Sequence, residues 1–354
     1  MKILHIITSL RTGGAEKLMV DLLPRLRDFG NEVELLLFDG TRTPFYDELE
    51  KVDVKIHHLA IGGNVYNPLN IFRLMKYLKD YDIVHTHNTA CQYFVPLAKI
   101  LSVTKCKLFT TEHSTNNRRR QYKLFKYLDK FIYSRYKYII SISDKATNSL
   151  NHFIGNKDNI ITFENGVDLS KFQNLKASNF EDNEKIITMV AGFREAKDQD
   201  TLIKAISLLP QEYKLWLVGD GERRQILEKL VIELDLGNRV EFLGIRSDIP
   251  QILEKSHIVV LSSHWEGFGL AAVEGMASGR PVIVSDVGGL REIVRGYGIL
   301  FPPQDAKTLA NEIKSLCENR DKYNQVALAC QERAKRYDIK KMAEKYNQRY
   351  HEHI

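Results

Sequence analysis

The stretch Ser262–Pro281, directly after the short apolar run Ile258–Leu261, contains a glycine-rich turn and two glutamates, Glu266 and Glu274. The turn, Glu266-Gly-Phe-Gly, leads into a helix that the sequence predicts to begin near Leu270. Free backbone N–H groups and the positive end of the helix dipole make such a helix start suitable for a phosphate. Glu274, one turn inside the helix, is then placed to accept hydrogen bonds from ribose hydroxyls, and Glu266 from hydroxyls beyond the phosphate. On these two glutamates alone, a helix capped by Glu266 with Glu274 solvated is the better interpretation.

Two basic residues upstream suit a ligand that carries phosphate. Arg194 and Lys197 follow the apolar run that ends near Ala191. A guanidinium fork and an ammonium point charge both pair with the negative charge of phosphate oxygens. The alternative interpretation of Arg194 is a solvated arginine at a helix start. Asp198-Gln-Asp200 has the spacing of a metal-binding pair, but we expect it to open a helix, where acidic residues complement the dipole.

The N-terminal half offers a second group of candidates. Gly13 and Gly14 follow the first apolar run, and glycines there allow a ligand to approach the backbone closely. His113 ends a later run and is a candidate hydrogen-bonding group. His85 and His87 have the spacing of a metal pair on a strand, but we identify no third ligand in the sequence, so no metal site is expected.

Short apolar runs alternate with amphipathic helical segments such as Ala15–Phe29 and Asn70–Lys79. This alternation predicts an α/β protein with two Rossmann-like halves, whose parallel sheets are covered by helices and face each other across a cleft. We expect domains at 1–168 and 186–338, a polar linker at 169–185, and a C-terminal helix at 339–354 that returns to the first domain. The expected strands are Lys2–Ile7, Glu32–Phe38, Val54–His58, Ile83–Thr86, Lys107–Thr111, Tyr138–Ile142, Lys185–Ala191, Lys214–Val218, Val240–Leu243, Ile258–Leu261 and Pro281–Val284.

The ordered motifs resemble those of the family 4 retaining glycosyltransferases, which have the GT-B fold. The family signature, two glutamates separated by seven residues inside an EGFGL…EGMA.G.PVI.S..GG block, matches Glu266–Gly289 almost residue for residue. Further matches extend the resemblance along most of the chain: Gly13-Gly14-Ala15-Glu16, Glu112-His113, Asn165-Gly166-Val167-Asp168 and Val218-Gly219-Asp220-Gly221-Glu222.

The resemblance implies a role for each candidate. Glu274 would bind the donor ribose and Glu266 the transferred sugar. Lys197 aligns with the family lysine that meets the diphosphate, whereas the family arginine falls at Gly192, and Arg194 would have to reach the phosphate from two residues later. The remaining implied donor contacts are the backbone around Phe268, Gly269 and Leu270, the glycines Gly13, Gly14 and Gly219, and His113, which would hydrogen-bond the donor sugar or its surroundings.

The resemblance and the residues together predict a retaining transferase that moves a sugar from a nucleoside diphosphate sugar to a glycan or lipid-linked acceptor. UDP is the commoner nucleotide of the donor in the family. No motif contains a carboxylate that we identify as a nucleophile. We therefore expect a front-face reaction, in which the departing phosphate oxygen helps to deprotonate the acceptor hydroxyl, without cofactor or metal. The alternatives are a nucleotide-sugar epimerase of GT-B layout and a non-catalytic nucleotide-sugar-binding subunit. Dinucleotide binding is set aside, because neither half has G-x-G-x-x-G after its first strand.

Charge and composition indicate where the protein works. Of its net charge of +6, the stretch from Lys99 to Lys145 supplies a local excess, with 12 Lys or Arg against 3 Asp or Glu. We expect Arg118–Lys137 to form a helix whose apolar face, with Leu124, Leu128 and Phe131, packs on the core. Its basic face either lies in water or binds an anionic membrane surface; no nucleic acid is expected. Four scattered cysteines and the absence of a long apolar run predict a cytoplasmic protein, peripheral on the inner face of the cell membrane if the basic face binds lipid.

Overall fold

The computed structural model describes residues 1–11, 13–113, 122–176, 181 and 183–352, which form two α/β units. The first unit comprises Met1–Gly166 together with Ile339–Ile354, and the second comprises Val167–Asp338. Each unit is built on one sheet in which every paired strand is parallel to its neighbour. The predicted pair of Rossmann-like α/β halves is therefore confirmed.

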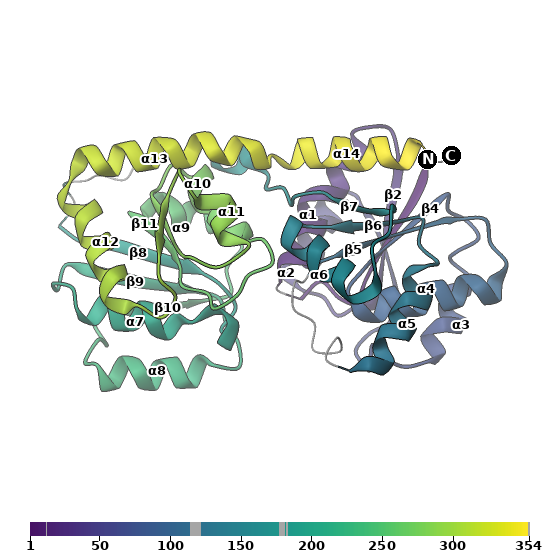
Figure 1. The fold of residues 1–354 in the computed structure, drawn as a ribbon, viewed down its shortest axis with the longest axis horizontal. Coiled ribbons are helices and arrows are strands. Elements are labelled where there is room, and N and C mark those ends of the chain that lie inside the picture. The colour runs from purple at the N-terminus through teal and green to yellow at the C-terminus, as the bar shows by residue number, and fades with distance from the viewer. Residues whose placement is uncertain (12, 114–121, 177–180, 182, 353–354) are drawn as a thin grey trace. The chain divides into compact units, whose positions relative to one another are not determined.

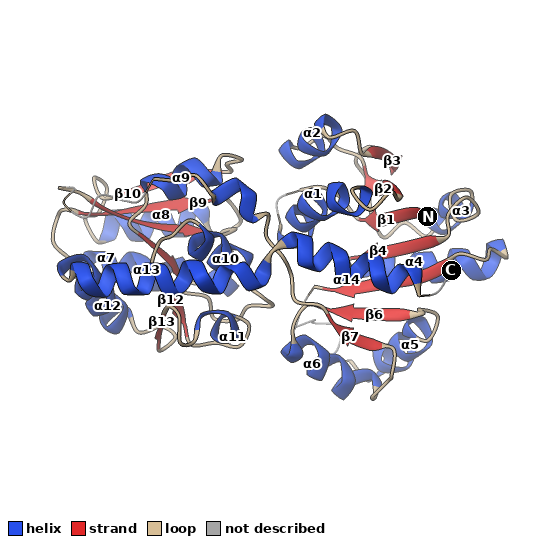
Figure 2. Cartoon of the chain, turned by 90° about the horizontal axis from the view of Figure 1, so that it is seen from above, coloured by secondary structure: helices blue, strands red, loops and turns tan. Residues whose placement is uncertain are grey.

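The first unit has a seven-stranded sheet in the order β3-β2-β1-β4-β5-β6-β7, and Figure 2 shows its strands side by side. Its strands are β1 (Lys2–Ile7), β2 (Glu32–Asp39), β3 (Lys55–Ala60), β4 (Ile83–His87), β5 (Lys107–Glu112), β6 (Tyr138–Ser141) and β7 (Ile160–Thr162). Its helices are α1 (Gly14–Arg27), α2 (Pro44–Lys51), α3 (Leu69–Met75), α4 (Thr89–Ser102), α5 (Lys123–Tyr133), α6 (Asp144–Ile154) and α14 (Ile339–His351).

Helices cover both faces of this sheet, as Figure 1 shows for α14 on one side and α3 to α5 on the other. Successive side chains of a strand point to opposite faces. In β1, Ile3 and Ile7 accordingly pack with α1 and α14, whereas Leu4 and Ile6 pack with α3, α4 and α5. A sheet buried on both faces needs strands that are apolar throughout, which explains why these runs are recognisable in the sequence.

The second unit has a six-stranded sheet in the order β10-β9-β8-β11-β12-β13. Its strands are β8 (Lys185–Val190), β9 (Tyr213–Val218), β10 (Val240–Gly244), β11 (Ile258–Leu261), β12 (Val282–Ser285) and β13 (Ile299–Phe301). Its α-helices are α7 (Gln199–Ser207), α8 (Arg224–Glu233), α9 (Ile249–Lys255), α10 (Leu270–Ala277), α11 (Leu290–Val294), α12 (Ala306–Glu318) and α13 (Arg320–Ala334). Short 3₁₀ turns lie at Leu169–Phe172, Glu195–Lys197 and Lys335–Tyr337.

Sequence and structure differ in two ways at the level of elements. The short strands β7 and β13, three residues each, were not predicted, because so short a run has no readable period. The beginning of the expected linker packs on the second unit: Phe172 is buried, and Arg280 donates a hydrogen bond to the backbone oxygen of Lys176 at 2.6 Å.

The predicted orientation of helix α5 is wrong. Leu128 and Phe131, which we expected in the core, are each 42% exposed, and Tyr127 is 75% exposed. The buried face instead contains Asp129, Ile132 and Tyr133, and the Asp129 carboxylate accepts a hydrogen bond from the Tyr93 hydroxyl. Arg118 to Arg120 of the expected basic helix lie outside the described residues, and Leu124 lies at a position whose side chain is not described. Across the described part of the chain, no helix combines the length and the apolar character needed to cross a bilayer.

The C-terminal helix α14 inserts two tyrosines into the polar part of the first unit's core. The Tyr350 hydroxyl lies 2.5 Å from Nδ1 of His85, and the Tyr346 hydroxyl lies 3.0 Å from Oγ1 of Thr111. Thr111 Oγ1 in turn lies 2.8 Å from Nε2 of His85, so both ring nitrogens of this histidine have partners. All four side chains are fully buried. The helix is thereby tied to β4 and β5 by polar as well as apolar contacts.

Three fully buried imidazoles, which we call the histidine cluster, lie on this face of the sheet: His5, His85 and His87. His5 on β1 is the registered neighbour of His85 on β4. The rings of His85 and His87 are stacked, with centroids 4.6 Å apart and planes inclined by 1°. Burial lowers the pKa of His5 to about 3, and burial together with neighbouring histidines holds the pKa values of His85 and His87 well below their usual range.

The histidine cluster predicts a loss of stability in mild acid. The unfolded chain binds protons at a pKa of about 6.5, whereas the folded cluster stays neutral, so the unfolded state binds more protons and stability rises with pH. Each buried histidine should therefore cost about 1.4 kcal/mol per pH unit below 6.5, until its folded pKa is reached. Urea unfolding of the wild type and of His5→Leu between pH 5 and pH 7.5 measures this. The variant should show a shallower dependence on pH by about one proton, and equal slopes would contradict the prediction.

Candidate functional site

Three loops bring the predicted residues of the second unit to one edge of its sheet. Arg194 and Lys197 follow β8, Gly219 follows β9 and Glu266 follows β11. These strands are neighbours in the order β9-β8-β11, and they run parallel, so their carboxyl ends and the loops after them lie at the same edge. Ligands of open parallel sheets bind at this edge.

Lys197 and Glu266 form an ion pair across two of these loops. The Lys197 Nζ donates a hydrogen bond to Oε2 of Glu266, and the two side chains are 24% and 15% exposed. The sequence named both residues but did not predict that they contact each other. A basic and an acidic group held together at a partly open edge can present charge and hydrogen-bond acceptors to one ligand.

Two residues that the sequence did not single out hold these loops together. The buried Ser262 hydroxyl donates to the backbone oxygen of Asp198 at 2.6 Å, next to Lys197. The backbone N–H of His264 donates to the oxygen of Ala196 at 2.9 Å. Both residues lie in the predicted Ser262–Pro281 segment, so proximity to the motif was the available signal for them. Their hydrogen bonds fix the position of Lys197 relative to Glu266.

Helix α10 begins at Leu270, as predicted, and Gly269 caps it in a left-handed conformation with φ of +98°. A Cβ atom at Gly269 would lie 2.5 Å from Cδ2 of Leu290, so both the backbone angle and the available space favour glycine. The Phe268 ring is buried against Tyr337, with centroids 5.4 Å apart. Because that ring points into the unit, the turn has its backbone N–H groups to offer a ligand. Glu274, inside α10, is 7% exposed.

Arg194 lies over Gly192. A Cβ atom at Gly192 would be 3.8 Å from Nε of Arg194, an ordinary van der Waals contact, so the guanidinium lies beside the space in which a side chain at 192 would begin. Arg194 is exposed, and among the described residues its guanidinium has no hydrogen-bond or ion-pair partner. The neighbouring loop is close: Gly219 has φ of +135°, and a Cβ there would collide with the backbone oxygen of Ala191.

The carboxylates of Asp198 and Asp200 both make structural contacts within the second unit. Asp198 caps α7 by accepting hydrogen bonds from the backbone N–H and hydroxyl of Thr201, at 3.3 and 2.6 Å. Burial raises the pKa of the Asp198 carboxyl. Asp200 forms an ion pair with Arg223 at 2.8 Å. The two carboxylates therefore open a helix, in the way the sequence indicated.

Gly13 of the first unit packs against a carboxylate. Helix α1 begins at Gly14 with Gly13 as its cap, and a Cβ at Gly13 would collide with Oε2 of Glu16. The other oxygen of Glu16 accepts a hydrogen bond from the Asn88 amide at 3.2 Å. Gly13 thus lets the Glu16 carboxylate lie directly against the turn that follows β1.

His113 is linked to the histidine cluster. Its Nε2 lies 2.9 Å from Nδ1 of His87, whose Nε2 lies 3.0 Å from Nδ1 of His5. His113 is half-buried, and burial lowers its pKa to about 4. At the carboxyl edge of the first sheet, His113 is therefore a neutral imidazole at neutral pH.

The expectation that His85 and His87 lack a third neighbouring ligand is wrong, because His5 lies beside them. The facing nitrogens of His5 and His87 are 3.0 Å apart, so they pair with each other in a hydrogen bond. Both nitrogens of His85 are occupied by Tyr350 and Thr111.

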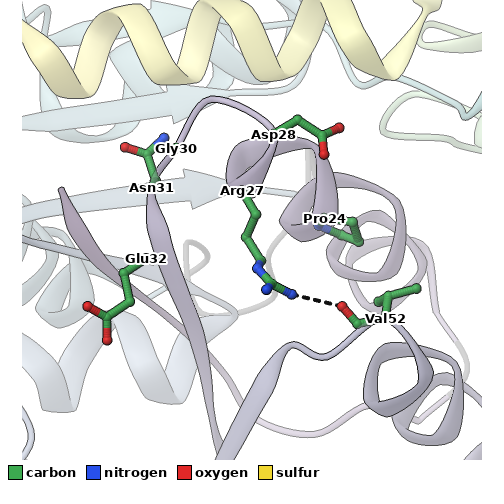
Figure 3. Close-up of a pocket in the computed structure, with 7 residues that line it drawn as sticks. All are labelled: Pro24, Arg27, Asp28, Gly30, Asn31, Glu32 and Val52. Atoms are coloured by element: carbon green, nitrogen blue, oxygen red, sulfur yellow. Dashed lines mark hydrogen bonds between the residues drawn. The ribbon is translucent and has the colours of Figure 1, made fainter.

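A surface hollow of about 620 Å³ lies elsewhere in the first unit (Figure 3). It is lined by the end of α1 and the turn into β2, including Pro24, Asp28 and Asn31. The Arg27 guanidinium that borders it donates to the backbone oxygen of Val52 at 2.8 Å. This hollow is at the amino end of β2, and none of the predicted site residues lines it.

Comparisons with known proteins agree with this arrangement. The family model described as Glycosyltransferase Family 4 matches residues 12–171, and that described as Glycosyl transferases group 1 matches residues 170–336. An uncharacterised glycosyltransferase of Methanocaldococcus jannaschii is 29% identical, over 87% of this chain and 86% of its own. The Escherichia coli UDP-Gal:alpha-D-GlcNAc-diphosphoundecaprenol alpha-1,3-galactosyltransferase is 25% identical, over 90% and 89%.

Among solved structures, that of Anabaena HepE in complex with UDP and glucose superposes with a TM-score of 0.86. It is 22% identical to this chain and covers 99% of both chains, so it supports the fold. The two family models together account for the chain from residue 12 to residue 336, which includes every predicted site residue. With its two parallel-sheet units and the Glu266–Glu274 helix start, the chain belongs to the family 4 glycosyltransferases of the GT-B fold.

Proposed function

We propose that this glycosyltransferase is a retaining enzyme that transfers a sugar from a UDP-sugar to a glycan or lipid-linked acceptor in the synthesis of a cell-surface polysaccharide. The observation that carries the proposal is the Lys197–Glu266 ion pair at the edge where α10 begins. Two relatives support the choice of donor and acceptor: HepE, whose structure holds UDP and glucose, and the E. coli galactosyltransferase, whose name specifies UDP-Gal and a diphosphoundecaprenol-linked sugar.

The proposed donor contacts follow the chemistry of each group. Glu274, buried within α10, accepts hydrogen bonds from the ribose hydroxyls, and Glu266 accepts them from the transferred sugar. The backbone N–H groups of Phe268, Gly269 and Leu270 bind the diphosphate, with the helix dipole adding favourable charge. Gly219 has no side chain, so the loop after β9 lies directly against the Ala191 backbone, beside the loop after β8 that carries Arg194 and Lys197.

The proposed reaction is a front-face substitution. The bond from the anomeric carbon to the diphosphate oxygen breaks, the acceptor oxygen bonds to the same carbon from the same side, and the acceptor proton passes to the departing phosphate oxygen. Lys197 and Arg194 stabilise the charge on that leaving group. The protein's contribution is therefore positioning and electrostatics. An inverted anomeric configuration in the product would contradict this route.

The first unit contributes His113, Gly13 and Gly14 in this proposal. Neutral His113 hydrogen-bonds the donor sugar, and the turn at Gly13 and Gly14 approaches the donor through its backbone. The support for these three assignments is their place in the family motifs and their position after β5 and β1, at the carboxyl edge of the sheet.

Nucleotide binding tests the donor site. UDP should bind the wild type, and Glu274→Ala should weaken it about 10- to 100-fold, because a buried carboxylate loses its bonds to the ribose. Titration calorimetry with UDP, GDP and ADP measures this, with Glu241→Ala, an exposed glutamate on β10, as the matched control. Binding that is unaffected by Glu274→Ala would contradict the assignment, and preference for GDP or ADP would contradict the choice of base.

A charge-relocation experiment tests Arg194. Arg194→Ala should lower turnover of the UDP-sugar about 10- to 100-fold, and Lys197→Ala by at least as much, because each removes positive charge from the leaving group. Gly192 accepts a side chain, because the nearest atom to a Cβ at this position would be 3.7 Å away. The double variant Gly192→Arg with Arg194→Ala should therefore recover much of the lost rate. If the double variant were as slow as Arg194→Ala, or if Lys197→Ala turned over normally, the electrostatic role would be wrong.

We further propose that α5 places the protein on an anionic membrane surface. The exposed face of α5 combines the basic Lys126 and Lys130 with the apolar Tyr127, Leu128 and Phe131. The Arg135 guanidinium lies 4.5 Å from the centroid of the Phe131 ring. Burial and, after it, the positive charge of Lys130 lower the pKa of Lys157, so these two basic residues lie near each other. Aromatic side chains among basic ones are typical of helices that lie at a bilayer interface.

Vesicle flotation tests this surface. At low salt the protein should float with vesicles containing phosphatidylglycerol and should remain at the bottom with neutral vesicles. Each basic residue near the surface contributes about 1 kcal/mol, so Lys126→Glu with Lys130→Glu should abolish flotation. The matched control, Lys204→Glu with Lys229→Glu, makes the same charge change on α7 and α8 of the second unit. Equal flotation of the two double variants would rule out α5 as the binding face.

A further inference from the structure

The histidines of the first unit form a hydrogen-bonded chain that runs from the core to the carboxyl edge of the sheet. His5 Nδ1 lies 3.0 Å from His87 Nε2, and His87 Nδ1 lies 2.9 Å from His113 Nε2. The ring centroids along the chain are 5.3 and 5.2 Å apart, so each pair of rings meets edge to edge through its nitrogens. We call this chain the histidine relay.

The two ends of the relay are different. At the inner end, His5 Nε2 is buried and, among the described residues, has no hydrogen-bond partner. At the outer end, His113 Nδ1 has no partner in the described part of the chain, and His113 is half-buried. His85 stacks on His87 but does not belong to the relay, because its nitrogens bond to Tyr350 and Thr111.

Only two proton arrangements satisfy both hydrogen bonds when all three rings are neutral, because a neutral imidazole donates from one nitrogen and accepts at the other. Burial keeps the rings neutral by lowering the pKa values of His5 and His113 to about 3 and 4 and that of His87 well below its usual range. In the outward arrangement every ring carries its proton on Nδ1, and His113 Nδ1–H is left to donate. In the inward arrangement every ring carries it on Nε2, and His113 Nδ1 is left to accept.

The unpartnered nitrogen of His5 decides between the two arrangements. The inward arrangement leaves an N–H group of His5 buried without an acceptor, whereas the outward arrangement leaves only a lone pair there. Unpaired buried N–H groups are the rarer of the two in folded proteins, and each costs about 1–3 kcal/mol. The outward arrangement is therefore favoured.

We propose that His5 and His87 are positioning residues that fix His113 as the tautomer protonated at Nδ1, so that His113 donates a hydrogen bond to its ligand and does not accept a proton. The ligand atom that fits this donor is a sugar hydroxyl oxygen or a phosphate oxygen. The proposal rests on the proposed function for the identity of the ligand, a UDP-sugar, but the tautomer is a property of the free protein.

Nitrogen-15 NMR of the full chain labelled at histidine tests the tautomer directly. A protonated imidazole nitrogen resonates far upfield of a bare one, and the His113 signals are assigned by their loss in His113→Gln. We expect His5, His87 and His113 each to be protonated at Nδ1 and bare at Nε2. His113 protonated at Nε2, or an equal mixture of tautomers, would overturn the proposal.

Variants at His5 test whether the relay fixes the tautomer of His113. Asn at position 5 keeps an amide N–H close to the place of Nδ1, whereas Leu removes the donor. In His5→Asn the His113 signals and turnover should stay near the wild type; in His5→Leu His113 should become a mixture of tautomers and kcat/KM should fall about 10-fold. His85→Gln, which alters the stacked ring outside the relay, should leave the His113 tautomer unchanged. If His5→Leu does not fold, the wild-type and His5→Asn spectra still decide.

The two proposals fail in different ways. If His113 shows the Nδ1 proton but His113→Gln turns over a UDP-sugar as fast as the wild type, the donor contact assigned to His113 is wrong and the tautomer assignment stands. If His113→Gln is slow but His5→Leu leaves both the His113 tautomer and turnover unchanged, the donor contact stands and the relay is overturned.

Discussion

Parallel strand pairing is the constraint on which both candidate sites depend. Lys197 and Glu266 are 69 residues apart in the chain, and they form an ion pair because β8 and β11 are parallel neighbours whose loops leave the sheet at the same edge. An antiparallel arrangement of the same strands would send these loops to opposite edges. In each unit the candidate residues therefore lie at the carboxyl edge of the sheet, whereas the loops at the amino edge only connect elements. The hollow beside Arg27 lies at the amino edge.

The alternation of side chains along parallel strands has a second consequence in the first unit. It places His5 and His85 on one face and in register, beneath α14. Buried imidazoles are costly unless they are hydrogen-bonded, and the partners of His85 come from β5 and from Tyr350, which is 265 residues away. The C-terminal helix thus does more than cover apolar surface: it satisfies the polar core from which the relay to His113 starts.

The longer strands could be predicted from the sequence, because strands buried on both faces are apolar throughout. The start of α10 could be predicted too, since a left-handed glycine before a helix has a recognisable local pattern. Which face of α5 is buried could not be predicted. Apolar residues lie on more than one face of α5, since Ile132 and Tyr133 are buried whereas Leu128 and Phe131 are exposed. The buried face also contains Asp129, whose carboxylate accepts a hydrogen bond from the Tyr93 hydroxyl. The relay was missed because the strand pairing that brings His5 of β1 beside His87 of β4 is not encoded in the spacing of either run.

The arginine of the donor site shows why residue-by-residue comparison is too strict for charged groups. A guanidinium stabilises a leaving group through the position of its charge, and its long side chain can bring that charge to the same place from different backbone positions. The Nε of Arg194 lies next to the space in which a side chain at Gly192 would begin, and no ion pair among the described residues holds it elsewhere. A backbone-dependent residue such as Gly269 lacks this freedom, because its φ of +98° and the contact with Leu290 tie it to one position. Motif positions defined by backbone geometry should therefore tolerate less displacement than those defined by charge.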